Sequence, residues 1–141
     1  MPAEPAHIAL ANRSQCSLSC LINDTEDHSE WITVIAFYKA LHVVEAVLAR
    51  DGNHSHDHVA RDATLKGNPR YDKIYRHYRP LSAAATVARY LASPGGQTYK
   101  SFADYLSRSD VIDQMVNHHL HQVEKSASKF LGKNCGLHRC T

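Results

Sequence analysis

The stretch Ser29–Arg50, SEWITVIAFYKALHVVEAVLAR, decides the fold of this 141-residue chain. At about 100° per residue, its apolar side chains fall on two sides of a helix. One side carries Trp31, Ile35, Tyr38 and His42. The other side carries mainly Phe37, Val44, Val47 and Leu48. A helix that is apolar nearly all round is buried on both sides, and in so short a chain one side is a candidate subunit interface. We therefore predict a homodimer through this helix, and we expect Trp31, Tyr38 and Tyr78 to be structural.

Signals at both ends set the bounds of this helix. Asp27 or Ser29 can cap its start, and Gly52 ends it. The preceding residues, 1–26, hold Pro2 and Pro5 and show no sustained period. We expect them to form a loose, flexible N-terminal arm.

Further helices are expected towards the C-terminus. A short one should run from about residue 57 to 65, and the next should begin at Pro69 and be kinked or interrupted at Pro80. After a loop at residues 93–97, a final helical region should span 101–131 with a break near 107–109. No alternating strand pattern is visible, so the sequence predicts an all-α, up-and-down bundle of four to five helices over residues 27–131, followed by a tail at 132–141.

Charge gives a local signal rather than a global one. The formal net charge is only +2, with 43% hydrophobic and 21% charged residues, which is an ordinary globular balance. Between residues 50 and 90, however, bases outnumber acids. The bases are Arg50, Arg61, Lys66, Arg70, Lys73, Arg76, Arg79 and Arg89, and the acids are Asp51, Asp57, Asp62 and Asp72. This stretch is either a patch for an anionic partner or a solvated surface.

The expected cellular compartment follows from the lack of a membrane span and of a secretory signal in the sequence. No run approaches the roughly 20 apolar residues of a membrane span, and no base precedes Arg13, so we expect no secretory signal and a cytoplasmic protein with no membrane partner. The four cysteines then need an account other than disulfides. Zinc could bind across the two tails through Cys16, Cys20, Cys135, His138 and Cys140. Neither spacing is Cys-x2-Cys, so free thiols are favoured and no metal or cofactor is expected.

Histidines gather at one predicted turn, where residues 54–58 read HSHDH. A divalent metal could bind there, although a polar turn with solvent-facing rings is favoured. His118 and His121 are three apart and can share a helix face. His119 and His42 fall on apolar stripes, and we expect them to be hydrogen-bonded core histidines.

Basic residues also recur every three positions beside tyrosines in residues 70–79. The bases are Arg70, Lys73, Arg76 and Arg79, and the tyrosines are Tyr71, Tyr75 and Tyr78. Bases on an exposed helix face bind phosphate. We expect these bases to contact phosphate and the tyrosine rings to lie in the core.

Three segments together carry a family resemblance. They are Trp31…Phe37-Tyr38-Lys39-Ala40-Leu41-His42…Ala46, then His54…His58-Val59-Ala60-Arg61, then Tyr78…Leu81-Ser82…Ala88-Arg89-Tyr90. Their order over residues 29–92 resembles a bacterial branch of the HEPN superfamily. Members begin with a long helix of the FYxALH type, followed by a His-x-x-Arg helix and a Tyr-x-x-Leu-Ser segment that ends in Ala-Arg-Tyr. The resemblance implies a dimeric helical bundle that acts as an RNA-cutting toxin, as part of a defence system, or as a catalytically silent binding module.

Active members of that superfamily carry Arg-x4–6-His and cut RNA without a metal, using its 2′-hydroxyl as the nucleophile. By resemblance, Arg50 and His56 would be catalytic here, and a cognate antitoxin protein would be a partner. The pair lies at a helix end in the first half of the chain, whereas in active members it usually sits on later helices.

Around the same turn we expect RNA phosphate to be held by His54, His58, Arg61, Arg76, Arg79 and Arg89. Histidine can exchange protons near neutral pH, and arginine can stabilise charge that builds on phosphate. Two other classes of function stay open: a non-enzymatic protein-interaction domain, and a His-rich metal-binding helical protein.

Overall fold

The computed structural model describes residues 3–53, 57–132 and 134–138. Its elements are the α-helices α1 (Glu4–Asn23), α2 (Ser29–Arg50), α3 (His58–Gly67), α4 (Asp72–Tyr90), α5 (Arg108–Asp110) and α6 (His121–Leu131), the 3-10 helices η1 (Pro69–Tyr71) and η2 (Phe102–Asp104), and the π-helix η3 (Val111–Leu120). Within these ranges there is no β-strand, only an isolated bridge between Ala92 and Thr98. The prediction of an all-α chain is confirmed.

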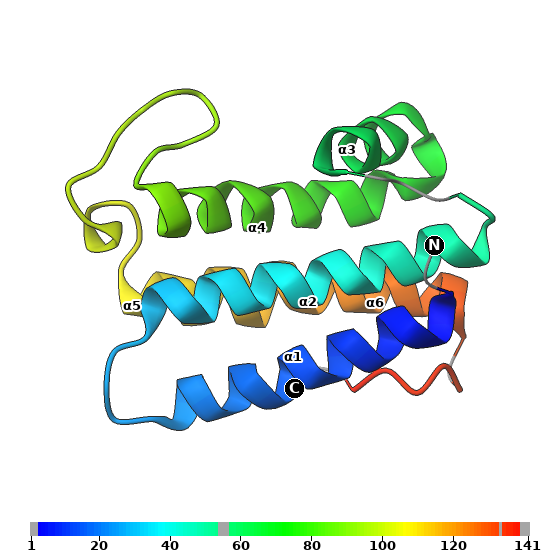
Figure 1. Cartoon of the computed structure of the whole chain (residues 1–141), viewed down its shortest axis with the longest axis horizontal. Coiled ribbons are helices and arrows are strands. Elements are labelled where there is room, and N and C mark those ends of the chain that lie inside the picture. The colour runs from blue at the N-terminus through cyan, green and yellow to red at the C-terminus, as the bar shows by residue number, and fades with distance from the viewer. Residues whose placement is uncertain (1–2, 54–56, 133, 139–141) are drawn as a thin grey trace.

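The long helices alternate in direction around α2, which lies at the centre (Figure 1). α1 runs antiparallel to α2 on one side, and α4 runs antiparallel to it on the other. α5, η3 and α6 form one continuous rod that packs on both α2 and α4. With that rod taken as one helix, the described ranges contain five main helices, of which four lie within the predicted bundle at 27–131 and the fifth, α1, precedes it.

The bounds predicted for α2 are confirmed. The predicted cap is wrong, however, because the N-cap residue is His28, whose side chain makes no capping hydrogen bond. Asp27 Oδ1 instead accepts a hydrogen bond of 3.0 Å from the backbone N–H of Ser29, the first residue of the helix. Gly52 follows the helix end with φ +79°, a conformation that favours glycine. However, the idea that this chain is too short to enclose α2 is wrong. α1, α4, η3 and α6 cover most of it, and Val44 is 0% exposed within one chain.

The prediction that no apolar run in the sequence approaches the length of a membrane span is wrong for α2. By length and composition it is apolar enough to cross a membrane, with a mean hydropathy of 1.7 over its most apolar stretch. Within the bundle, 78% of that stretch is buried, as in the core helix of a soluble protein. Burial by its own neighbours accounts for its apolar composition, and the cytoplasmic location stays a prediction.

The N-terminal residues are not a loose arm, because residues 4–23 form α1. This helix buries Ile8, Ala11 and Leu18 against the core. Asn12 of α1 also holds the C-terminal tail: its Nδ2 donates to the Gly136 carbonyl at 2.9 Å, and its Oδ1 accepts from the His138 backbone N–H at 2.7 Å. The two ends of the described chain are therefore fastened to each other and to α2.

The rest of the chain follows most of the predicted pattern. Asp57 caps α3 by accepting from the Ala60 backbone N–H, and Ser107 caps the final rod by accepting from Asp110, near the predicted break. Pro80 does not interrupt its helix, since α4 continues from Asp72 to Tyr90. The tyrosine prediction holds for Tyr78, which is 1% exposed, but Trp31 is 63% exposed and is not a core residue.

Candidate functional site

Of the predicted catalytic pair, Arg50 lies within the described residues and His56 lies outside them. Arg50 lies at the end of α2, where its Nη1 donates to Glu4 Oε1 at 3.1 Å and to the Leu131 carbonyl at 3.2 Å. This guanidinium therefore connects the ends of α1, α2 and α6. His54 and His56 lie outside the described residues, so the Arg50–His56 arrangement stays a prediction.

Arg61, predicted to contact phosphate, is buried. Its Nε donates to Glu45 Oε1 at 2.5 Å, and its Nη1 lies 3.0 Å from Nδ1 of His58. It also lies near Tyr78. Burial raises the pKa of the Tyr78 hydroxyl to about 12. Only 7% of Arg61 is exposed, so the structure places it as a link between α3 and α2.

The other three predicted arginines do not share one surface. Arg79 is exposed beside a hollow of about 320 Å³ that Asp62, Tyr75 and Tyr78 also line. Arg89 donates from Nε to the Ala85 carbonyl at 3.1 Å, and its guanidinium carbon lies 5.3 Å from the centre of the Tyr90 ring. Arg76 lines a different hollow, between α4 and α6. The residues predicted to form one phosphate-binding site around the turn therefore lie at separate positions on the surface.

A positively charged hollow lies between α4 and α6. A cavity of about 580 Å³ there is lined by Pro69, Arg70, Asp72, Lys73, Ile74, Arg76, Ser126, Lys129 and Phe130. A second, of about 250 Å³, is lined by Lys73, Arg76, His77, Gln122, Lys125, Ser126 and Lys129. Because the two share four residues, they form one continuous depression. We call it the basic groove, defined by Lys73, Arg76, Lys125 and Lys129.

The charges of the basic groove are largely uncompensated. None of its four defining cations forms an ion pair with another described residue. Arg70, at its edge, is held by Asp51 through two hydrogen bonds of 3.1 and 3.3 Å, and its guanidinium carbon lies 4.6 Å from the centre of the Phe130 ring. Asp72 is the acid among the lining residues. The groove is therefore suited to an anionic ligand.

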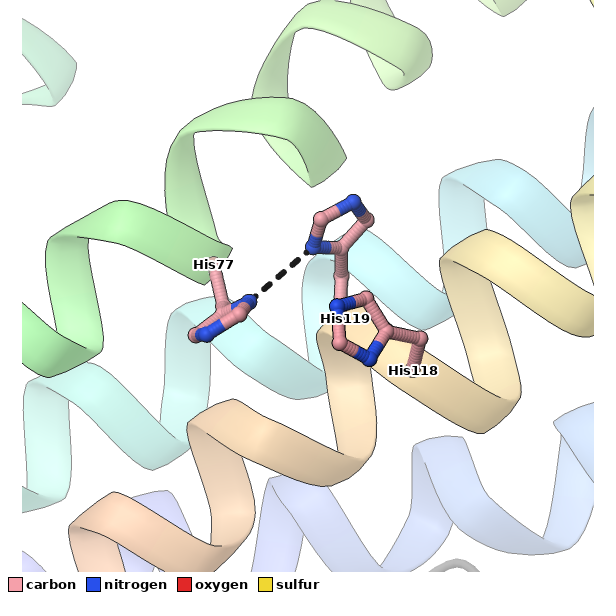
Figure 2. A group of neighbouring side chains, drawn as sticks. All are labelled: His77, His118 and His119. Atoms are coloured by element: carbon pink, nitrogen blue, oxygen red, sulfur yellow. Dashed lines mark hydrogen bonds between the residues drawn. The ribbon is translucent and has the colours of Figure 1, made fainter.

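Three histidines meet beside one end of the basic groove. His77 comes from α4, and His118 and His119 come from η3 (Figure 2). The Nδ1 atoms of His77 and His119 are 3.1 Å apart, and one ligand atom from each of the three rings lies within 4.8 Å of the others. Burial lowers the pKa of His77, and it lowers that of His119 to about 4. Both rings are therefore neutral at pH 7, with a nitrogen lone pair able to bind a metal.

No cysteine joins a comparable cluster among the described residues. Cys16 and Cys20 are exposed on α1, and Cys135 is partly buried in the tail. Cys140 lies outside the described residues. The zinc site considered across the two tails has no described group of three ligands to support it.

Sequence reasoning missed His77, Lys125 and Lys129 as site residues. It treated His118 and His119 separately and placed His119 in the core. His77 and His119 are separated by 42 positions, so no local spacing pattern joins them. Comparisons of the chain with protein-family models, curated proteins and solved structures find no match.

Proposed function

We propose that this chain is an RNA-binding module of the HEPN type that holds the RNA backbone in the basic groove between α4 and α6. The observation that carries this proposal is the convergence of Lys73 and Arg76 from α4 with Lys125 and Lys129 from α6 along one depression. Cations that neutralise phosphates release bound counterions, and this release supplies most of the affinity in sequence-independent binding.

The edge of the groove also offers a surface for a base. The guanidinium of Arg70 is oriented by Asp51 and lies over Phe130. Unpaired RNA bases stack on arginine planes and aromatic rings. Single-stranded RNA, which presents both phosphates and free base faces, is therefore the ligand that the groove fits best.

Binding and cleavage are separate parts of the proposal. Arg50 donates to Glu4 and Leu131, so a catalytic role for it would add to, or replace, these contacts. We propose binding as the function and keep metal-independent cleavage by Arg50 and His56, a homodimer and a cognate antitoxin as features that the family resemblance implies.

A direct test measures the binding of a fluorescein-labelled single-stranded RNA by anisotropy at several salt concentrations. The variant Lys125→Gln/Lys129→Gln is expected to bind more weakly. It should also reduce the slope of log K against log salt by about 0.7 for each phosphate that the protein no longer neutralises. The matched control is Lys66→Gln/Lys100→Gln, which removes the same charge from exposed sites outside the groove.

Equally weakened binding in the two variants, or no binding by the wild type, would contradict the groove proposal and turn attention to a protein partner. Cleavage is tested separately by incubating RNA with the protein in EDTA. Cleavage that His56→Ala abolishes would identify a ribonuclease, whereas intact RNA with unchanged binding would identify a silent module.

A further inference from the structure

We propose that His77, His118 and His119 bind one divalent transition-metal ion of the zinc class. Imidazole nitrogen suits Zn²⁺, Co²⁺, Ni²⁺ and Cu²⁺, whereas Mg²⁺ and Ca²⁺ prefer oxygen ligands. Three protein ligands leave a fourth position open for water or another ligand. This site is distinct from the predicted turn at residues 54–58 and does not depend on RNA binding.

The geometry of the cluster is close to what a metal requires. In a tetrahedral zinc site with Zn–N distances of about 2.0–2.1 Å, the nitrogens lie about 3.3–3.4 Å apart. The Nδ1 atoms of His77 and His119 are joined by a hydrogen bond of 3.1 Å, and the ligand atoms of the whole set lie within 4.8 Å. A metal bound by both Nδ1 atoms would replace this hydrogen bond, with the proton of each ring on Nε2. His118 is exposed, so its ring can change rotamer to complete the set.

The two adjacent histidines lie on an unusual helical segment, η3. In an ordinary α-helix, neighbouring side chains point about 100° apart, so two of them rarely serve one site. His118 and His119 instead lie in the ten-residue π-helix, and the ring of His77 contacts the rings of both. Helical segments of the π type are rare and frequent at functional sites.

The surroundings also determine what fills the open position. Imidazole binds a metal as an uncharged ligand, so an ion held by three histidines would keep its double positive charge. His77 lines the same cavity as Arg76 and Lys125, so the local field is already positive. An anion such as phosphate or hydroxide is therefore the fourth ligand that this environment favours.

The test titrates the reduced, chelator-treated protein with Zn²⁺ by calorimetry and with Co²⁺ by visible absorption. We expect one tight site per chain and a tetrahedral Co²⁺ spectrum without a thiolate charge-transfer band. Two triple variants form a matched pair, each removing three histidines: His77→Gln/His118→Gln/His119→Gln, and His54→Gln/His56→Gln/His58→Gln. The first should lose the site, and the second should keep it.

If the first triple variant does not fold, by circular dichroism, His118→Gln alone decides the question, because that side chain is exposed. Loss of one ligand should weaken Zn²⁺ binding by at least about tenfold, since even partners behind the ligands contribute that much. Absence of a tight site in the wild type, loss of the site only in the 54/56/58 variant, or a thiolate band in the Co²⁺ spectrum would overturn the proposal.

Discussion

Lys39 of α2 and Glu124 of α6 form an ion pair at the centre of the bundle, and neither side chain has any exposed surface. The Nζ of Lys39 also donates to Oε1 of Gln15 on α1 at 2.6 Å. The first two helices and the last helix of the bundle thus meet at one buried ion pair. Such a pair specifies how helices align, whereas its net contribution to stability is small or negative.

Removing one partner of this pair should be far more harmful than removing both. Lys39→Met is expected to lower the free energy of unfolding by about 3–5 kcal/mol, because Glu124 would lose its buried counter-charge. The double variant Lys39→Met/Glu124→Met should recover most of this loss. Urea unfolding measures the free energy of unfolding of both variants. A Lys39→Met protein as stable as the wild type would contradict the presence of a buried Lys39–Glu124 ion pair.

Val44→Asp should unfold the chain rather than separate two subunits. Val44 is 0% exposed within one chain, and a carboxylate there would be buried without a partner. Val59→Asp is the control, because Val59 is 78% exposed on α3. Circular dichroism and size-exclusion chromatography distinguish the outcomes. A folded Val44→Asp monomer derived from a wild-type dimer would show that α2 is an interface after all.

Trp31→Ala should change the free energy of unfolding by less than about 1 kcal/mol, since most of the side chain is exposed. Phe37→Ala, in the same helix, should cost about 3–5 kcal/mol because Phe37 is 1% exposed. Trp31 is the chain's single tryptophan, so acrylamide quenching of native fluorescence reports it alone. Quenching much weaker than that of the unfolded chain would be inconsistent with this exposure.

Acid should destabilise the protein partly through His42. Burial, with the nearby His7, lowers the pKa of His42 below 6.5. The unfolded chain therefore binds a proton that the folded chain resists. This contribution to stability is fully present above pH 6.5 and is lost as the pH falls towards the folded-state pKa. Unfolding measured from pH 7.5 to 5 should show a shallower acid loss in His42→Gln.

Three other groups near His42 have to be considered in that experiment. His7 contacts its ring, Glu45 favours its protonated form, and Arg61 opposes it. His7→Gln is therefore the necessary companion variant. If His42→Gln and the wild type lose stability in parallel over this range, another group is responsible.

The sequence predicted the bounds of α2 because its apolar periodicity is strong and local and because Gly52 marks its end. α1 was missed because the side chains that it buries include only two large aliphatic ones, Ile8 and Leu18. Trp31 was misplaced for a different reason. Periodicity shows which residues share a helix face, but not whether another helix covers that face, and here the covered side is that of Phe37 and Val44.

The candidate sites were predictable only in part. Arg76 was identified because bases recur along its helix, but Lys125 and Lys129 complete the groove from α6. Likewise, His118 and His119 stand out in the sequence, while His77 joins them only because α4 packs on η3. Both sites are made by the pairing of α4 with the final rod, and no short-range spacing encodes that pairing.

The central place of α2 has a consequence for how the chain is made. Of the described helices that cover α2, α1 alone precedes it, and α4, η3 and α6 follow it. As synthesis proceeds from the N-terminus, a helix apolar enough to enter a membrane emerges long before Leu131 completes its cover. α1 is therefore the only described helix that is already synthesised when α2 emerges, and α1 and α2 together should bury part of that apolar surface before α4 and the final rod follow.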